Sequence, residues 1–80
     1  MEITLNKLQP GEKGKIIKVA GEKAIKRKLY DMGVTPGTEL VLRKVAPLGD
    51  PIEINIRGYS LSLRKAEAET IIIEKKVWTI

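Results

Sequence analysis

The sequence contains no cysteine and no histidine among its 80 residues. Without cysteine, the chain forms no disulfide and offers no thiolate to a metal ion. Without histidine, it lacks the side chain that most often serves as a general base and as a transition-metal ligand. No apolar run approaches the roughly 18 residues that a membrane span requires, and the polar start of the chain, interrupted by Pro10-Gly11, is unlike a secretion signal. A cytosolic protein is expected.

Positive charge is concentrated in one part of the chain. The formal net charge is +5, and the stretch from Lys13 to Lys28 holds seven basic residues and one acidic residue, Glu22. The remaining residues include eight basic and nine acidic side chains, a net charge of −1. Such a patch is typical of surfaces that meet nucleic acid, an anionic membrane or an acidic protein face. A solvated, lysine-rich surface explains this composition equally well.

Hydrophobic spacing divides the chain into short elements. Ile25, Leu29 and Met32 lie at i, i+4 and i+7 and predict a helix from Glu22 to Met32 that ends at Gly33. Strands are predicted at residues 14–20, 39–45, 52–57, 59–64 and 70–74, with helical turns at 5–8 and 65–69. The first strand does not alternate cleanly across Ile16 and Ile17, which suggests a bulge or packing on both faces. A turn at Pro36-Gly37 precedes the second strand.

The stretch from Pro47 to Ala68 is the most informative part of the chain. Two prolines bracket a loop centred on Leu48, and two alternating strands meet at Gly58. The pattern predicts one mainly β domain over residues 1–80, with a core at about 4–74 and a C-terminal tail at 75–80. About five short antiparallel strands, one helix inserted after the first strand and short helical turns favour a small barrel, because closure hides the sheet edges.

Several pieces of the sequence, in this order, resemble the FeoA family of small proteins of bacterial ferrous iron transport. They are the Leu5 to Gly14 stretch, KRKLYDMGVTPGTEL, PLGDPIEI and the glycine turn followed by LSLRKAEAETI. The resemblance spans roughly Leu5 to Glu74 and implies an SH3-like barrel. It also implies action with FeoB, a membrane permease that carries a cytosolic GTPase domain. Similar domains occur at the C-terminus of metal-dependent bacterial repressors, so a small basic nucleic-acid-binding or repressor-type barrel is the alternative.

Catalysis and tight metal binding are not supported by the residues. Ser60 and Ser62 have no histidine to activate them, and Asp50 suits a turn-stabilising role. Glu67 and Glu69 are two residues apart and do not face each other on a helical turn. A selective ferrous site normally uses imidazole or thiolate, so no catalytic residue, cofactor or iron site is predicted. Nucleic-acid readers need stacking aromatics, and the three that the chain has (Tyr30, Tyr59 and Trp78) are dispersed.

Protein recognition needs only an exposed apolar residue beside charges. Leu48 at the loop tip is the first candidate, although the loop could equally fold back and bury it. The polar helix face is the second candidate, and ordinary solvation is its alternative explanation. Its residues are Lys23, Lys26, Arg27 and Tyr30. Leu5 and Leu8 are expected to fill the barrel, and Trp78 either extends the last strand or contacts a partner.

Overall fold

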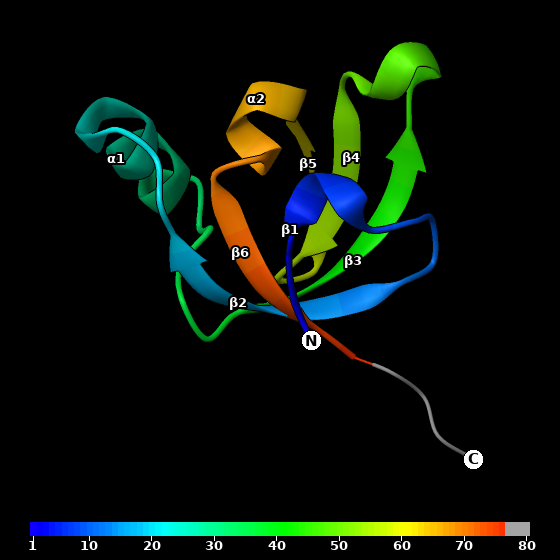
Figure 1. Cartoon of the computed structure of the whole chain (residues 1–80), viewed down its shortest axis with the longest axis horizontal. Helices are drawn as coiled ribbons and strands as arrows, with labels where there is room; N and C mark the ends of the chain where they lie inside the picture. Colours follow the sequence, from blue (N-terminus) through cyan, green and yellow to red (C-terminus); the bar gives the residue numbers. More distant parts are fainter. Residues whose placement is uncertain (77–80) are drawn as a thin grey trace.

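The computed structural model describes residues 1–76, and its centre is one antiparallel sheet (Figure 1). The strands are β1 (Glu2–Thr4), β2 (Lys13–Val19), β3 (Glu39–Val45), β4 (Ile52–Ile56), β5 (Tyr59–Leu63) and β6 (Ile71–Lys75). The α-helices are α1 (Lys23–Asp31) and α2 (Lys65–Ala68), and the 3-10 turns are η1 (Leu5–Lys7) and η2 (Pro47–Gly49). The strands pair in the order β1-β6-β2-β3-β4-β5. The prediction of a mainly β, SH3-like fold is confirmed.

The interior of the curled sheet is entirely aliphatic in the described residues. In β4, Ile52, Ile54 and Ile56 are buried while Glu53 and Asn55 are half-buried, so the predicted alternation is confirmed. Most of the remaining core residues come from other strands, the helices and the η1 segment that surround this interior. They include Leu5 and Leu8 from the η1 segment, Leu40 and Leu42 from β3, Ala68 from α2, and Ile71 and Ile73 from β6. Leu5 and Leu8 therefore fill the barrel as expected.

β2 contains the bulge that its irregular pattern suggested. Its pairing with β6 changes register between Ile16 and Lys18, so one extra residue, Ile17, lies between them. Ile16 is buried, whereas 41% of Ile17 is exposed. The bulge thereby explains how two successive isoleucines occupy one strand without both entering the core.

α1 ends where the sequence predicted, in a Schellman motif. Gly33 adopts φ +92°, its N–H donates to the Tyr30 carbonyl at 3.0 Å, and the Val34 N–H donates to the Leu29 carbonyl at 2.9 Å. Leu29 and Val34 are both fully buried. This C-terminal motif therefore fixes which face of α1 packs on the sheet, and the lysines of α1 remain exposed to solvent.

The β4–β5 hairpin connects the sheet to the C-terminal end of α1. Arg57 and Gly58 form its two-residue turn with φ +52° and +83°, the combination of a type I′ turn. The Tyr59 hydroxyl donates to the Met32 carbonyl, and the Arg57 guanidinium donates to the Thr35 hydroxyl at 3.3 Å. α1 is thus held by polar contacts as well as by its apolar face.

Three features of the fold differ from the sequence-based expectation. β1 makes a sixth strand, which was not predicted because three residues are too few to show a period. β1 and β5 lie at the two ends of the pairing order. The expectation that barrel closure would hide the sheet edges is therefore not met in residues 1–76. β6 extends through Lys75 into the predicted tail. Trp78, for which two roles were considered, lies outside the described residues.

α2 is joined to α1 and to the η2 segment by carboxylates. Glu67 accepts a hydrogen bond from the Lys28 ammonium at 2.7 Å and one from the Arg64 backbone N–H at 3.0 Å. The Lys28 hydrogen bond, followed by the Arg64 N–H, holds the pKa of Glu67 below its usual range. Asp50 accepts from the Lys65 backbone N–H at 3.1 Å, so its carboxylate stabilises the start of α2. The sequence had suggested a different role, in which Asp50 stabilises its own turn.

Replacing Glu67 with glutamine tests the contribution of this carboxylate. Because its pKa is lowered by folding, its stabilisation is present above the unfolded value of about 4.3 and is lost as the pH falls through the folded value. We expect Glu67→Gln to lower the free energy of unfolding by about 1 kcal/mol at pH 7 in urea denaturation, with the difference disappearing in acid. Glu69→Gln, an exposed neighbour, is the control. Equal effects of both variants at pH 7 would contradict the assignment.

Candidate interaction surfaces

Leu48 is the most exposed large apolar side chain of the described residues. Its exposed fraction is 98%, which answers the question that the sequence left open. Its backbone is also left-handed, with φ +69°, a conformation that costs a non-glycine residue about 1 kcal/mol or more. A leucine that is both unburied and strained contributes nothing to packing, so the loop presents it outward at a cost in stability.

The Leu48 loop (residues 46–51) is fixed by hydrogen bonds at its base. The Ala46 N–H donates to the Pro51 carbonyl at 3.0 Å, and the Gly49 N–H donates to the Ala46 carbonyl at 2.9 Å. Asp50 reaches the start of α2 through its bond to Lys65. These contacts hold the leucine in one place before any partner arrives, which limits the ordering cost of binding.

Apolar surface continues beside the Leu48 loop. A hollow of about 330 Å³ borders it, and Val45, whose exposed fraction is 38%, is one of the residues that line it. Lys44 and Glu53 supply charges at the same hollow. Val45 was not predicted as a contact residue, because alternation along β3 identifies the two faces of the strand but not where its end becomes exposed.

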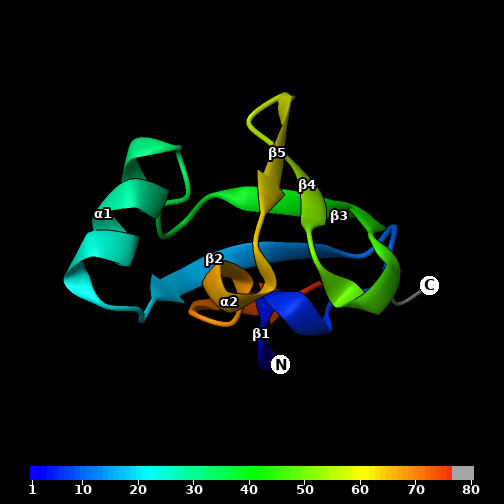
Figure 2. The ribbon, with the colours of Figure 1, turned by 90° about the horizontal axis from the view of Figure 1, so that it is seen from above.

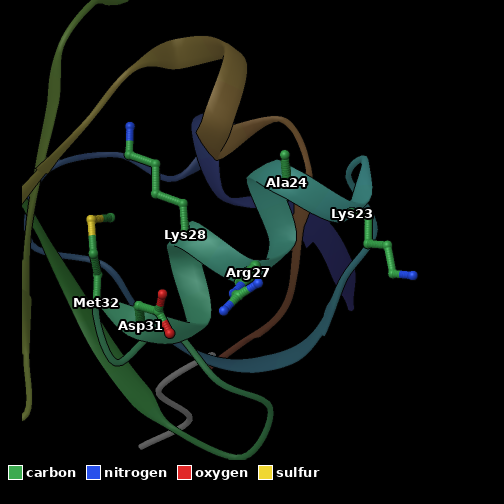
Figure 3. A pocket seen from close by; sticks show the side chains of 6 residues that line it. All are labelled: Lys23, Ala24, Arg27, Lys28, Asp31 and Met32. Atoms are coloured by element: carbon green, nitrogen blue, oxygen red, sulfur yellow. The ribbon is translucent and has the colours of Figure 1, made fainter.

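The basic face of α1 (Lys23, Lys26, Arg27 and Tyr30) is exposed as a second surface. The Lys26 ammonium lies 5.8 Å from the centre of the Tyr30 ring, and 38% of Tyr30 is exposed. Lys23 and Arg27 line an open hollow of about 680 Å³ on α1, together with Ala24, Lys28, Asp31 and Met32 (Figure 3). None of the salt bridges within residues 1–76 includes Lys23, Lys26 or Arg27.

The structure does not bring the two surfaces together. In both ribbon views, α1 and the Leu48 loop lie at opposite ends of the sheet (Figures 1 and 2). A partner that contacts both must reach across the molecule. Otherwise each surface serves a separate contact.

Three observations on residues 1–76 concern metal ligation, membrane spanning and the serines of β5. No group of three acidic side chains converges there in a way that could hold a metal ion. No helix in the same range is long and apolar enough to cross a membrane. Ser60 and Ser62 are exposed on β5, and neither hydroxyl has a basic side chain as a hydrogen-bond partner.

A family model, a solved structure and a fusion protein each match most of this chain. A family model described as the FeoA domain matches residues 3–75. A FeoA-like protein from Clostridium acetobutylicum is 43% identical, with a TM-score of 0.89, 99% of this chain covered and 92% of that one. The Fe(2+) transport protein A/Fe(2+) transporter FeoB fusion protein of Porphyromonas gingivalis is 31% identical over 70 residues. The match covers 88% of this chain but only 8% of the fusion protein.

More distant structures share the fold alone. A Stenotrophomonas maltophilia FeoA, described as a prokaryotic SH3 domain protein complexed with zinc, is 24% identical, with a TM-score of 0.79. The match covers 90% of this chain and 89% of that one. A manganese-dependent transcriptional repressor is 16% identical, with a TM-score of 0.87, and the match covers 94% of this chain and 37% of the repressor chain.

The strained exposure of Leu48 predicts an unusual pattern of stabilities. Glycine relieves the left-handed strain but makes the unfolded chain more flexible, so Leu48→Gly should leave the free energy of unfolding within about 0.5 kcal/mol of the parent. Leu48→Val should lower it by about 1 kcal/mol, because a β-branched residue tolerates this conformation worst. Leu42→Ala, in the core, should cost about 2–5 kcal/mol by the same urea measurement. A large loss in Leu48→Gly would mean that Leu48 packs in solution.

Proposed function

The chain belongs to the FeoA family, and we propose that it serves ferrous iron transport as a non-enzymatic cytosolic partner of the permease FeoB. The proposed action is binding to the cytosolic region of FeoB, which shifts the populations of its nucleotide-bound or transport-competent states. The chain is not proposed to hold iron itself, because it has neither imidazole nor thiolate. Iron is the cargo of the permease in this scheme.

The fusion relative supports a physical association. In that protein, transport protein A and the FeoB transporter form a single chain, so the two units are present together at a fixed ratio. Joining two modules raises their effective concentration for one another, which favours contact between them. We propose that the separate chain makes a comparable contact without the covalent link.

The exposed, strained Leu48 is the observation that carries this proposal. Burying a leucine side chain against a partner contributes roughly 1.5–3 kcal/mol. Because the loop is already fixed at its base, little of that gain is lost to ordering. Leu48 is therefore the proposed apolar contact, and Val45 beside it enlarges the patch.

The basic face of α1 is proposed to guide the encounter. Exposed charges contribute little to affinity but raise association rates when the partner surface has the opposite sign. Lys23, Lys26 and Arg27 are exposed and form no salt bridge with the described residues. An acidic surface on the partner is therefore proposed, with Tyr30 as an aromatic contact at its border.

Leu48→Asp tests the apolar contact. The variant should fold normally, because the side chain is exposed, and should weaken binding to the isolated cytosolic region of FeoB by at least about tenfold in calorimetric titration. Ile17→Asp is the matched control, since Ile17 is another exposed aliphatic residue but lies on the bulge of β2. Unchanged binding by a folded Leu48→Asp variant would remove Leu48 from the contact.

The same titration separates this proposal from the nucleic-acid alternative. Single- and double-stranded oligonucleotides are added to the parent protein at physiological salt. We expect no saturable binding to them. Saturable binding to the oligonucleotide alone, with a steep dependence on salt, would favour the repressor-type function instead.

Reversing two charges on α1 tests the guiding role. Lys26→Glu combined with Arg27→Glu should slow association with the FeoB cytosolic region by about tenfold at low salt and should leave the dissociation rate nearly unchanged. Lys7→Glu with Arg43→Glu is the control, because it changes the net charge equally at exposed positions outside α1. Stopped-flow or surface-based kinetics measures both rates. If the α1 variant associates as fast as this control, α1 does not steer the encounter.

A further inference from the structure

β5 has a free edge. It pairs with β4 on one side, and on its other side no strand of residues 1–76 pairs with it. The two-residue turn at Arg57-Gly58 makes Ile56 and Tyr59 a hydrogen-bonded pair, so the pairs alternate outward from there. The N–H and C=O groups of Ser60 and Ser62 therefore point away from β4, toward the free edge.

Nothing in β5 itself prevents another strand from pairing there. Natural edge strands are commonly protected by charged residues, prolines, bulges or very short length. β5 has none of these features: its sequence is Tyr-Ser-Leu-Ser-Leu, its register with β4 is unbroken, and it is five residues long. The opposite edge, β1, is only three residues long. Ser60 and Ser62 are both exposed, and within residues 1–76 neither forms a backbone hydrogen bond to a loop, turn or helix cap.

Basic residues flank this edge at both ends. Arg57 lies before β5, and Arg64 and Lys65 follow it. None of these three residues forms a salt bridge within residues 1–76, although Arg64 is near enough to Glu67 to contribute to the lowered pKa of that carboxyl. The Arg57 guanidinium contacts two neutral hydroxyls, those of Thr35 and Thr38, so its charge is not compensated by an acid.

The positions of these charges favour an acidic strand over a second copy of the chain. If β5 paired with the β5 of another copy in antiparallel fashion about Leu61, Arg57 of each would lie opposite Lys65 of the other. Like charges placed opposite one another in a ladder are destabilising. An extended segment with acidic residues at its two ends meets the same positions with opposite sign.

The inner side of the edge offers an apolar contact for such a strand. Leu61 is half-buried against the core, and Met32, which caps the C-terminal end of α1, is half-buried next to Tyr59. Lys28 and Met32 line the hollow on α1 (Figure 3). Because Lys28 also binds Glu67 of α2, this part of the hollow lies toward α2. An added strand can therefore place a small apolar side chain near Leu61, with its backbone bonded to Ser60 and Ser62.

We propose that the free edge of β5 binds an extended segment of a partner protein, apolar in its middle and acidic at both ends, as a seventh strand. This mode is β-augmentation, in which backbone hydrogen bonds supply affinity and flanking side chains select the sequence. The site does not include Leu48, although Ser62 also lines the hollow beside the Leu48 loop, and it does not depend on which protein supplies the segment. It can therefore be tested with a peptide, and its failure would leave the FeoB proposal untouched.

The probe is a peptide of about nine residues with alternating threonine and valine in its middle and two glutamates at each end, a length that spans β5 and its flanks. We expect the backbone amides of Ser60 and Ser62 to shift in proton–nitrogen NMR spectra and to become protected from hydrogen exchange. The same peptide with lysines in place of the glutamates should bind at least about tenfold more weakly. Equal binding of the two peptides would overturn the selection for acidic ends.

Two modifications test the backbone pairing itself. The peptide with N-methyl groups throughout its middle keeps every charge but loses its N–H donors, and it should bind at least about tenfold more weakly. Ser62→Pro removes an outward N–H of β5 and should weaken binding of the unmodified peptide similarly, whereas Ser62→Ala should bind normally. If the proline variant does not fold, the methylated peptide still decides, because it uses the parent protein.

Three outcomes would overturn the proposal. Equal affinity of the methylated and unmodified peptides would mean that binding is by charge alone. Peptide-induced shifts confined to α1, without protection of Ser60 and Ser62, would place the peptide on the basic face. Protection of these two amides in concentrated protein without peptide, together with a dimer in sedimentation, would make the second copy the occupant.

Discussion

The burial of aliphatic side chains inside the curled sheet is the interaction on which the rest of the structure depends. Ile52, Ile54 and Ile56 occupy its centre, and no polar or charged residue of residues 1–76 is buried with them. Each fully buried side chain of this kind contributes roughly 1.5–3 kcal/mol, against conformational entropy of similar total size. Within residues 1–76, the amide oxygen of Asn6 in η1 is the buried side-chain polar atom that has no hydrogen-bond partner. The contacts proposed for the molecule lie on its surface.

The segment from Arg57 to Glu67 connects both candidate surfaces to that core. At its beginning, Tyr59 and Arg57 contact the carbonyl and hydroxyl groups that follow α1. At its end, Glu67 binds Lys28 of α1, and the Lys65 N–H binds Asp50 of the Leu48 loop. Two surfaces at opposite ends of the sheet are therefore fixed by one continuous stretch, which also supplies the free edge of β5. The side chains and backbone of this most distinctive part of the sequence therefore position other surfaces.

Periodicity predicted the elements well, because the core has two simple requirements. The alternation of β4 and the i, i+4, i+7 spacing of α1 follow from which side chains must be buried, and Gly33 and Gly37 lie where positive φ is needed. β1 was missed because three residues show no period, and its stability comes from pairing with β6. The free edge of β5 was missed because a pattern within a strand does not reveal which remote strands pair. The left-handed backbone of Leu48 is likewise set by the whole loop, so its exposure could not be decided from the sequence.

The magnitudes of these contacts determine how the surfaces must cooperate. Complete burial of Leu48 contributes at most roughly 3 kcal/mol, and each exposed charge pair at α1 contributes about 0–1 kcal/mol. A micromolar complex requires about 8 kcal/mol net, after the cost of association has been met. With these magnitudes, the proposed contacts through Leu48 and the lysines of α1 are expected to give a fast and transient complex rather than a long-lived one. Pairing of a partner strand along β5 would add several backbone hydrogen bonds at once and would bury additional surface. Such a contact would therefore increase the net binding free energy. The functional state of this small domain is thus expected to depend on how many of its separate surfaces one partner can occupy at the same time.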